Sequence, residues 1–167
     1  MNSSKLVLSG LLAVLSLPAF AADERPLPAA ATADKVLVMK SERKLYLLED
    51  GKILKAYHVS LGGHPVGRKM REGDERTPEG EYVLDWHNPD SDYYRSIHIS
   101  YPSAEDVARA RRLGVPPGGD LFIHGQPNGF AGKESGDWTE GCIAVTDAEM
   151  DEIWRAVADG TPIEIKR

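Results

Sequence analysis

The sequence predicts a β-rich α+β fold, a curved mixed sheet or β-sandwich with two short helices. Apolar runs of strand length recur along the chain, glycine-containing turns separate several of them, and two segments carry helix start signals. The 167 residues suffice for one domain with a buried core. An apolar fraction of 41% and a charged fraction of 28% are ordinary for a globular protein.

The expected strands are short apolar runs bounded by polar or turn residues. Asp50-Gly51 separates two of these runs and favours a hairpin, because a type I′ turn needs positive φ at both central residues. The expected strands are 35–40, 44–49, 52–60, 81–86, 98–101, 120–125 and 161–165.

Two helices are expected, one beginning at Ser103 and one at Thr146. Each of these residues stands three positions before an acidic residue, which is the pattern of a capping box. Gly114 and Gly160 stand where the two helices should end. The second helix places its apolar residues on one face, at Met150, Ile153, Trp154 and Val157.

Residues 1–21 have the pattern of a secretory signal peptide. Lys5 precedes an apolar run over 6–17, and Ala19-Phe20-Ala21 provides a small-residue cleavage site. This run is shorter than the roughly 20 residues of a membrane-spanning helix, so we expect cleavage after Ala21. An uncleaved membrane anchor is the alternative. We expect a flexible Ala- and Pro-rich leader over 22–34, a folded domain over 35–167, and an exported periplasmic or envelope protein without a transmembrane anchor.

Charge and cysteine content exclude several classes of function. The net charge of −6 argues against a nucleic-acid binder, which usually shows a basic surface. A single cysteine excludes an intrachain disulfide and a cysteine-rich zinc site, and no histidine pair has metal-binding helical spacing. The segment 62–76 carries four basic and three acidic residues. Because these charges nearly cancel, we expect a solvated loop there rather than an anion site.

Cys142 and His124 are the residues that carry candidate chemistry. Cys142 follows Gly141 at the end of a glycine-rich polar loop over 126–140, and the expected strand 120–125 ends near His124. An unpaired exported cysteine is a buried apolar residue, an intermolecular link or a reactive thiol. Its position after the loop favours a thiol nucleophile with an imidazole base and backbone amides that bind an oxyanion. We place Trp138, beside the loop end, near the substrate.

These segments resemble the YkuD-type L,D-transpeptidase family, whose members act on bacterial peptidoglycan. The specific part is a His-Gly followed, after a loop, by Ser or Thr, any residue, Gly-Cys and a β-branched residue. Here the histidine and the cysteine are 18 positions apart. The resemblance covers about 34–166, through Ser60-Leu-Gly-Gly63, Arg76-Thr-Pro-Glu-Gly80, His98-Ile-Ser-Tyr-Pro102, Ile123-His-Gly125 and Thr139-Glu-Gly-Cys-Ile143.

The resemblance implies a role for each matching residue. Cys142 would be the nucleophile and His124 its general base and acid. Gly125 would supply a backbone carbonyl that orients the imidazole, and the amides of Gly141 and Cys142 would form the oxyanion hole. Thr139 would shape the loop that carries them. The residues expected to contact substrate are Thr139, Trp138, Glu140 and Tyr101.

The implied reaction is attack on the meso-diaminopimelate–D-alanine bond of a tetrapeptide stem. D-Alanine leaves and a thioester remains on Cys142. An amine of another stem, a lysine of a wall-anchored lipoprotein or a free D-amino acid then accepts the acyl group, whereas water would make the protein an amidase or carboxypeptidase. Ala144 and Glu140 stand where many members have arginine and histidine. A non-catalytic wall-binding domain is the alternative from another class, and no metal or organic cofactor is implied.

Overall fold

The computed structural model describes residues 25–132 and 134–167, so the expected signal peptide lies outside the described residues. The helices are α1 (Ala104–Leu113) and α2 (Asp147–Ala156), with one short 3-10 helix, η1 (Lys40–Glu42). The strands are β1 (Lys35–Met39), β2 (Lys44–Glu49), β3 (Lys52–His58), β4 (Gly80–Asn88), β5 (Ser96–Ile99), β6 (Leu121–His124), β7 (Ile143–Ala144) and β8 (Thr161–Lys166).

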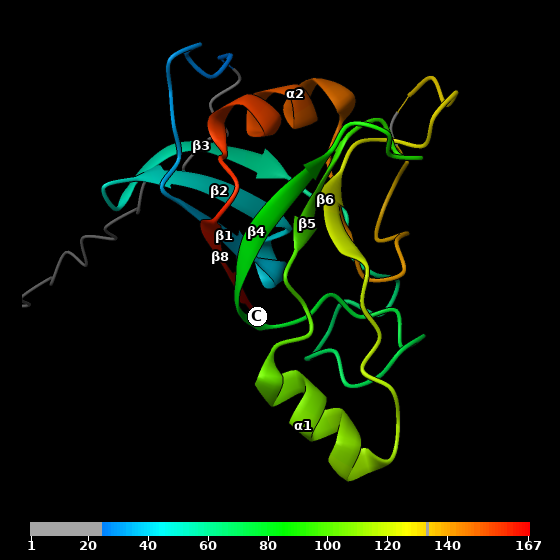
Figure 1. Cartoon of the computed structure of the whole chain (residues 1–167). Coiled ribbons are helices and arrows are strands. Elements are labelled where there is room, and N and C mark those ends of the chain that lie inside the picture. Colours follow the sequence, from blue (N-terminus) through cyan, green and yellow to red (C-terminus); the bar gives the residue numbers. More distant parts are fainter. Residues whose placement is uncertain (1–24, 133) are drawn as a thin grey trace, which may run out of the picture.

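One mixed sheet of eight strands forms the framework, in the order β3-β2-β1-β8-β4-β5-β6-β7. β1 pairs with β8 and β6 with β7 in parallel, and the other neighbours are antiparallel. The sheet is curled: the half containing β3, β2 and β1 and the half containing β5 and β6 run in different directions (Figure 1). This confirms the expected β-rich curved mixed sheet with two helices.

The core lies on the concave side of the sheet and is covered by α2, whereas α1 lies at the opposite end of the molecule (Figure 1). Alternate strand residues face this core, as the two-residue period of a half-buried strand predicts. Those with at most 2% exposure include Val36, Val38, Leu45, Leu47, Ile97, Ile99, Ile123, Ile163 and Ile165. Met150 and Ile153 of α2 are also fully buried, so the predicted apolar face of this helix completes the core.

Both helices begin with the predicted capping boxes. The Ser103 hydroxyl accepts from the Asp106 amide, and the Thr146 hydroxyl accepts from the Glu149 amide. α1 ends at Gly114, as expected, with a left-handed φ of 69°. The expected end of α2 at Gly160 is wrong. The helix ends at Ala156, because Val157 turns to extended backbone and forms a β-bridge with Ala33.

The expected leader over 22–34 contributes to the packed domain in its described part. Leu27 is 4% exposed, and its amide donates to a Glu152 carboxylate oxygen of α2 at 3.1 Å. The Ala33 amide donates to the Ala156 carbonyl at 2.8 Å. Packing therefore begins before β1. Within the described ranges, no helix has the length and apolar character needed to cross a membrane.

Candidate active site

Cys142 and His124 lie on adjacent strands of the curled sheet. Ile123 of β6 pairs with Ile143 of β7 in parallel register, so Cys142 lies beside Phe122, two residues from His124. Both Ile123 and Ile143 are fully buried in the core. Since successive side chains of a strand point to opposite faces, Cys142 and His124 project together from the other face. The two-residue strand β7, which the sequence analysis did not predict, fixes this juxtaposition.

The hydrogen bond of the His124 ring defines its tautomer. Nδ1 lies 2.7 Å from the Gly125 carbonyl oxygen. A carbonyl can only accept, so Nδ1 carries the proton and Nε2 has a free lone pair. Burial lowers the pKa of His124 and outweighs the Gly125 hydrogen bond, which raises it. The imidazole is therefore neutral at pH 7 and can accept a proton.

Two aromatic rings pack against this imidazole. Tyr93 lies 4.7 Å and Trp138 5.7 Å from the His124 ring, measured between centroids. Trp138 therefore contacts the expected base. Its indole Nε1 is buried without a hydrogen-bond partner in the part of the chain that the structure describes. The sequence analysis did not identify Tyr93, because no local pattern relates its loop between β4 and β5 to the end of β6.

The Cys142 thiol is protonated in the resting structure. Burial raises its pKa to about 11, against the opposing effects of a Phe122 backbone hydrogen bond and the positive charge of Lys69. The negative charges of Glu140 and Asp120 raise it further. A thiol in this state needs a base to become a nucleophile. The neutral imidazole of His124 is a base of the required kind.

A tight turn carries the thiol. The Thr139 hydroxyl accepts from the Gly141 amide at 3.2 Å and donates to the Cys142 carbonyl at 2.8 Å. The Gly141 amide, which was expected in the oxyanion hole, therefore donates to the Thr139 hydroxyl in this structure. The Cys142 amide does not donate to that hydroxyl. Gly141 has a φ of 136°, and a Cβ there would lie 2.8 Å from the Arg76 carbonyl oxygen. Only glycine fits this position without strain.

Backbone pairing fixes the turn and β7 to the segment that follows β3. Ser60 and Ala144 exchange two hydrogen bonds of 2.9 Å. The Thr139 amide donates to the Leu61 carbonyl at 3.1 Å, and the Gly63 amide donates to the Thr139 carbonyl at 3.0 Å. These contacts place the thiol in a rigid frame.

An ion pair adds a side-chain contact to this frame. The Arg43 guanidinium binds both carboxylate oxygens of Asp137: Nη2 lies 2.7 Å from Oδ2, and Nε lies 3.0 Å from Oδ1. The Leu61 amide donates to the same carboxylate at 3.0 Å. Asp137 immediately precedes Trp138 and Thr139, so this contact connects the glycine-rich loop to the turn between β1 and β2.

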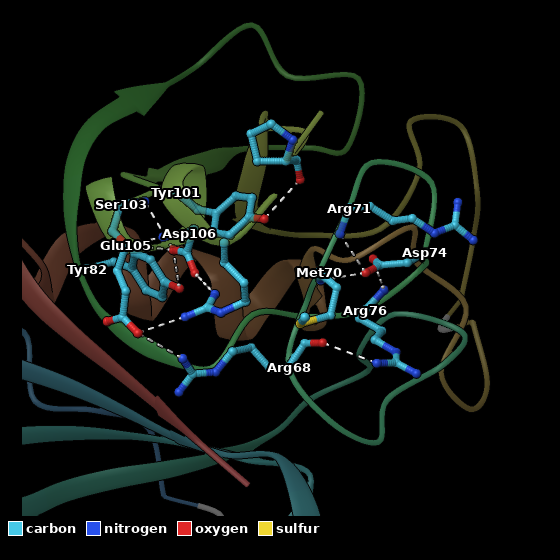
Figure 2. Close-up of polar contacts among 12 residues, drawn as sticks. Arg68, Met70, Arg71, Asp74, Arg76, Tyr82, Tyr101, Ser103, Glu105 and Asp106 are labelled. Atoms are coloured by element: carbon cyan, nitrogen blue, oxygen red, sulfur yellow. Dashed lines mark hydrogen bonds and ion pairs between the residues drawn. The ribbon is translucent and has the colours of Figure 1, made fainter. Parts of the chain in front are cut away.

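The expectation of a solvated loop over 62–76 is wrong for its central charges. The Lys69 side chain is 3% exposed and the Asp74 side chain 9% exposed, with Nζ 2.9 Å from the carboxylate. The Asp74 carboxylate also accepts from the backbone amides of Met70, Arg71 and Arg76 (Figure 2). Burial alone would raise the pKa of Asp74, but these hydrogen bonds lower it.

A second buried lysine, in η1, connects the interior of the same loop to the residues that follow it. Lys40 is 2% exposed. Its ammonium donates to the carbonyls of Gly67 and Thr77 at 2.6 and 2.8 Å and to the Glu79 carboxylate at 3.0 Å. Burial lowers the pKa of Lys40 despite its bond to Glu79. Counting charges along the sequence could not distinguish these compensated charges from solvated ones.

The remaining expected site residues lie in different surroundings. Glu140 is exposed beside Thr139. Tyr101 is 3% exposed, packs edge-to-face on Tyr82 and donates its hydroxyl to the Pro117 carbonyl at 2.9 Å. Ala144 is 1% exposed. Over residues 25–132 and 134–167, no group of three or more His, Cys, Asp or Glu side chains is arranged to hold a metal ion.

Comparison with known proteins identifies the family of this chain. Residues 33–165 match the family model of the YkuD L,D-transpeptidase catalytic domain. The chain belongs to the YkuD L,D-transpeptidase family. It is 32% identical over 128 residues to the L,D-transpeptidase YafK of Escherichia coli (strain K12), covering 73% of this chain and 46% of YafK. The resemblance inferred from the sequence is confirmed.

Solved structures with the same fold include a cell shape determining protein and an L,D-transpeptidase. The helical cell shape determining protein Pgp2 from Campylobacter jejuni superposes with a TM-score of 0.62 at 29% identity, covering 80% of this chain and 48% of Pgp2. An L,D-transpeptidase from Xylanimonas cellulosilytica superposes with a TM-score of 0.54 at 18% identity, covering 84% of this chain and 64% of that one, and supports the fold alone. This YkuD-family chain spans about half the length of YafK and Pgp2.

Proposed function

We propose that this chain is a peptidoglycan L,D-transpeptidase that forms a thioester on Cys142. The observation that carries the proposal is the register of β6 and β7, which places the Cys142 thiol and the neutral His124 imidazole on the same face of adjacent strands. The His124 Nδ1 proton is held by the Gly125 carbonyl at 2.7 Å. The free lone pair of Nε2 is then available to the thiol. Membership of the YkuD family supports the donor, the diaminopimelate–D-alanine amide of a tetrapeptide stem.

In the acylation half, the Cys142 proton passes to Nε2 of His124 as sulfur bonds to the amide carbon. The carbonyl oxygen becomes an oxyanion, for which the Cys142 amide is the proposed hydrogen-bond donor. The Gly125 carbonyl stabilises the transient imidazolium through Nδ1–H. The carbon–nitrogen bond then breaks, the departing D-alanine amine takes the proton from Nε2, and the acyl group remains on sulfur.

In the deacylation half, an incoming amine attacks the thioester and His124 again acts as base and acid. The exposed Glu140 carboxylate, two residues before Cys142, supports an ammonium-bearing acceptor by its charge. This acceptor is an amine of another stem, a free D-amino acid or a lysine of a wall-anchored lipoprotein. The expected signal peptide would deliver the chain to the envelope, where these substrates occur.

Mass analysis of muropeptides tests the proposal. The protein and its Cys142→Ala variant are incubated with tetrapeptide-stem peptidoglycan and a D-amino acid. We expect stems carrying the exchanged residue, or direct diaminopimelate crosslinks, only with the unmodified protein. Shortened or released stems without exchange would instead identify water as the acceptor. Identical products from both proteins would contradict the enzymatic proposal and favour a wall-binding role.

A further inference from the structure

The loop 62–76 lines an open cavity of about 340 Å³ that the proposed mechanism does not use. The backbone folds around the Asp74 carboxylate, and the side chains of Arg71 and Arg76 leave the loop on the same side (Figure 2). The residues that line the cavity are His64, Met70, Arg71, Gly73, Asp74 and Arg76.

The charges around this cavity do not cancel. Asp74 is neutralised by the buried ammonium of Lys69 at 2.9 Å, and the Glu75 carboxylate lies 3.3 Å from the His64 ring. Among the described residues, the Arg76 guanidinium donates to one acceptor, the neutral carbonyl of Arg68, at 3.3 Å. The Arg71 guanidinium has no ion-pair or hydrogen-bond partner in the part of the chain the structure describes. Two arginines therefore line the cavity without a carboxylate partner among the described residues, in a chain of net charge −6.

The same loop borders the nucleophile. The Arg76 carbonyl is so close to Gly141 that a Cβ on this glycine would lie 2.8 Å from its oxygen. Gly141 directly precedes Cys142, and the charge of Lys69 reaches the thiol. Neither Glu140 nor Ala144, which flank Gly141-Cys142-Ile143, offers a cation. The loop 62–76, which packs against Gly141, carries Lys69, Arg71 and Arg76.

We infer that this cavity binds a carboxylate of the stem peptide, with Arg71 and Arg76 as the binding residues. The inference rests on the proposed function for the identity of the ligand. A tetrapeptide stem offers three sources of this chemistry: the terminal D-alanine, the diaminopimelate side chain and the D-glutamate α-carboxylate. Planar guanidinium groups match carboxylates in geometry and charge, which makes arginine well suited to such a site.

The test measures equilibrium binding of the soluble tetrapeptide stem to the Cys142→Ala protein by calorimetry, so that turnover plays no part. Arg71→Gln and Arg76→Gln are introduced into this background, with Arg112→Gln on the exposed face of α1 as the matched control. We expect each cavity substitution to weaken binding about tenfold, since a lost charge-assisted hydrogen bond has an effect of this size. The control should change binding by less than about twofold. Arg76→Lys, which keeps the charge, should restore part of the affinity.

Three singly amidated peptides identify the carboxylate. Amidation of the bound carboxylate should weaken binding of the peptide to the Cys142→Ala protein. With that peptide, Arg71→Gln and Arg76→Gln should cause no further loss of affinity. The inference is overturned if the parent does not bind the stem, if the cavity variants bind as the Arg112→Gln control does, or if their effect persists with all three amidated peptides. Failure of the proposed function would look different: muropeptide products would be independent of Cys142 while arginine-dependent binding remained.

Discussion

The turn 139–142 and the loop 62–76 pack against each other at Gly141, but different interactions hold them. The turn is fixed by neutral backbone hydrogen bonds to Ser60, Leu61 and Gly63 and by the close approach of two main chains. The loop is organised by buried charges, above all by the ion pair between Lys69 and Asp74. Loss of one partner of a buried ion pair leaves an uncompensated charge, whereas the turn depends mainly on the geometry of its backbone. The nucleophile is therefore expected to be sensitive to shape, and the adjacent loop to charge and pH.

Asp74→Asn should have the largest effect. It leaves the buried Lys69 ammonium without a counterion, so we expect a loss of about 3 kcal/mol in the free energy of unfolding. Urea denaturation measures this loss. The double variant Lys69→Met/Asp74→Asn should recover much of it, because the unpaired charge is then removed. If the double variant is as unstable as the sum of the two single variants, buried charge does not organise the loop.

Gly141→Ala tests the backbone frame. The new Cβ would lie 2.8 Å from the Arg76 carbonyl oxygen at a φ of 136°, so the turn must move. Because a shift of about 1 Å in a reacting group can reduce turnover about 100-fold, we expect a loss of that size in muropeptide exchange. Gly119→Ala is the control, since a Cβ at Gly119 has no neighbour within 4 Å. Normal turnover by Gly141→Ala would contradict the argument from shape.

The reactivity of Cys142 tests whether the charge of Lys69 in the loop changes the pKa of the thiol. With a thiol pKa of about 11, alkylation by iodoacetamide should keep rising well above pH 8 instead of reaching a plateau near neutrality. Lys69→Met should slow alkylation further at each pH in this range, because the Lys69 charge lowers the pKa of Cys142. Cys142 is the only thiol of the chain, so the measurement needs no background substitution. A plateau below pH 8 would instead indicate a preformed thiolate–imidazolium pair.

Acid should weaken the loop through Asp74, with a smaller effect. Its pKa is lowered in the folded protein, so its contribution is present above the ordinary value of 3.8 and is lost as pH falls through the lower folded value. The difference in unfolding free energy between the protein and Asp74→Asn should therefore shrink as pH decreases below about 4. Denaturation curves at pH 6 and pH 3 measure it. A difference that does not change with pH would show that the ion pair is not responsible.

The two regions also differ in how far the sequence predicts them. Cys142, His124 and Gly125 could be identified because their chemistry depends on local order, a His-Gly at a strand end and a Gly-Cys after a loop. The capping boxes at Ser103 and Thr146 are local for the same reason. The burial of Lys40 and Lys69 could not be predicted, because their compensating carbonyls and carboxylates become neighbours only after the chain folds.

The two-residue strand β7 and the contact between Tyr93 and His124 were likewise beyond local patterns. β7 exists because β6 and Ser60 provide partners on its two sides, and two residues alone have no recognisable period. The packing of Leu27 on α2 also depends on a partner distant in sequence, Glu152. Local signals thus predicted which residues are candidates for the chemistry, and tertiary contacts determine the frame that positions them.

The most direct test of the central claim is the intact mass of the protein shortly after mixing with a tetrapeptide stem and no acceptor. We predict an adduct on Cys142 equal in mass to the stem acyl group without its terminal D-alanine, lost on addition of an amine acceptor. The Cys142→Ala protein should show no adduct, and His124→Ala should form it far more slowly. Turnover without an adduct, or an adduct that survives Cys142→Ala, would contradict a thioester mechanism at this site.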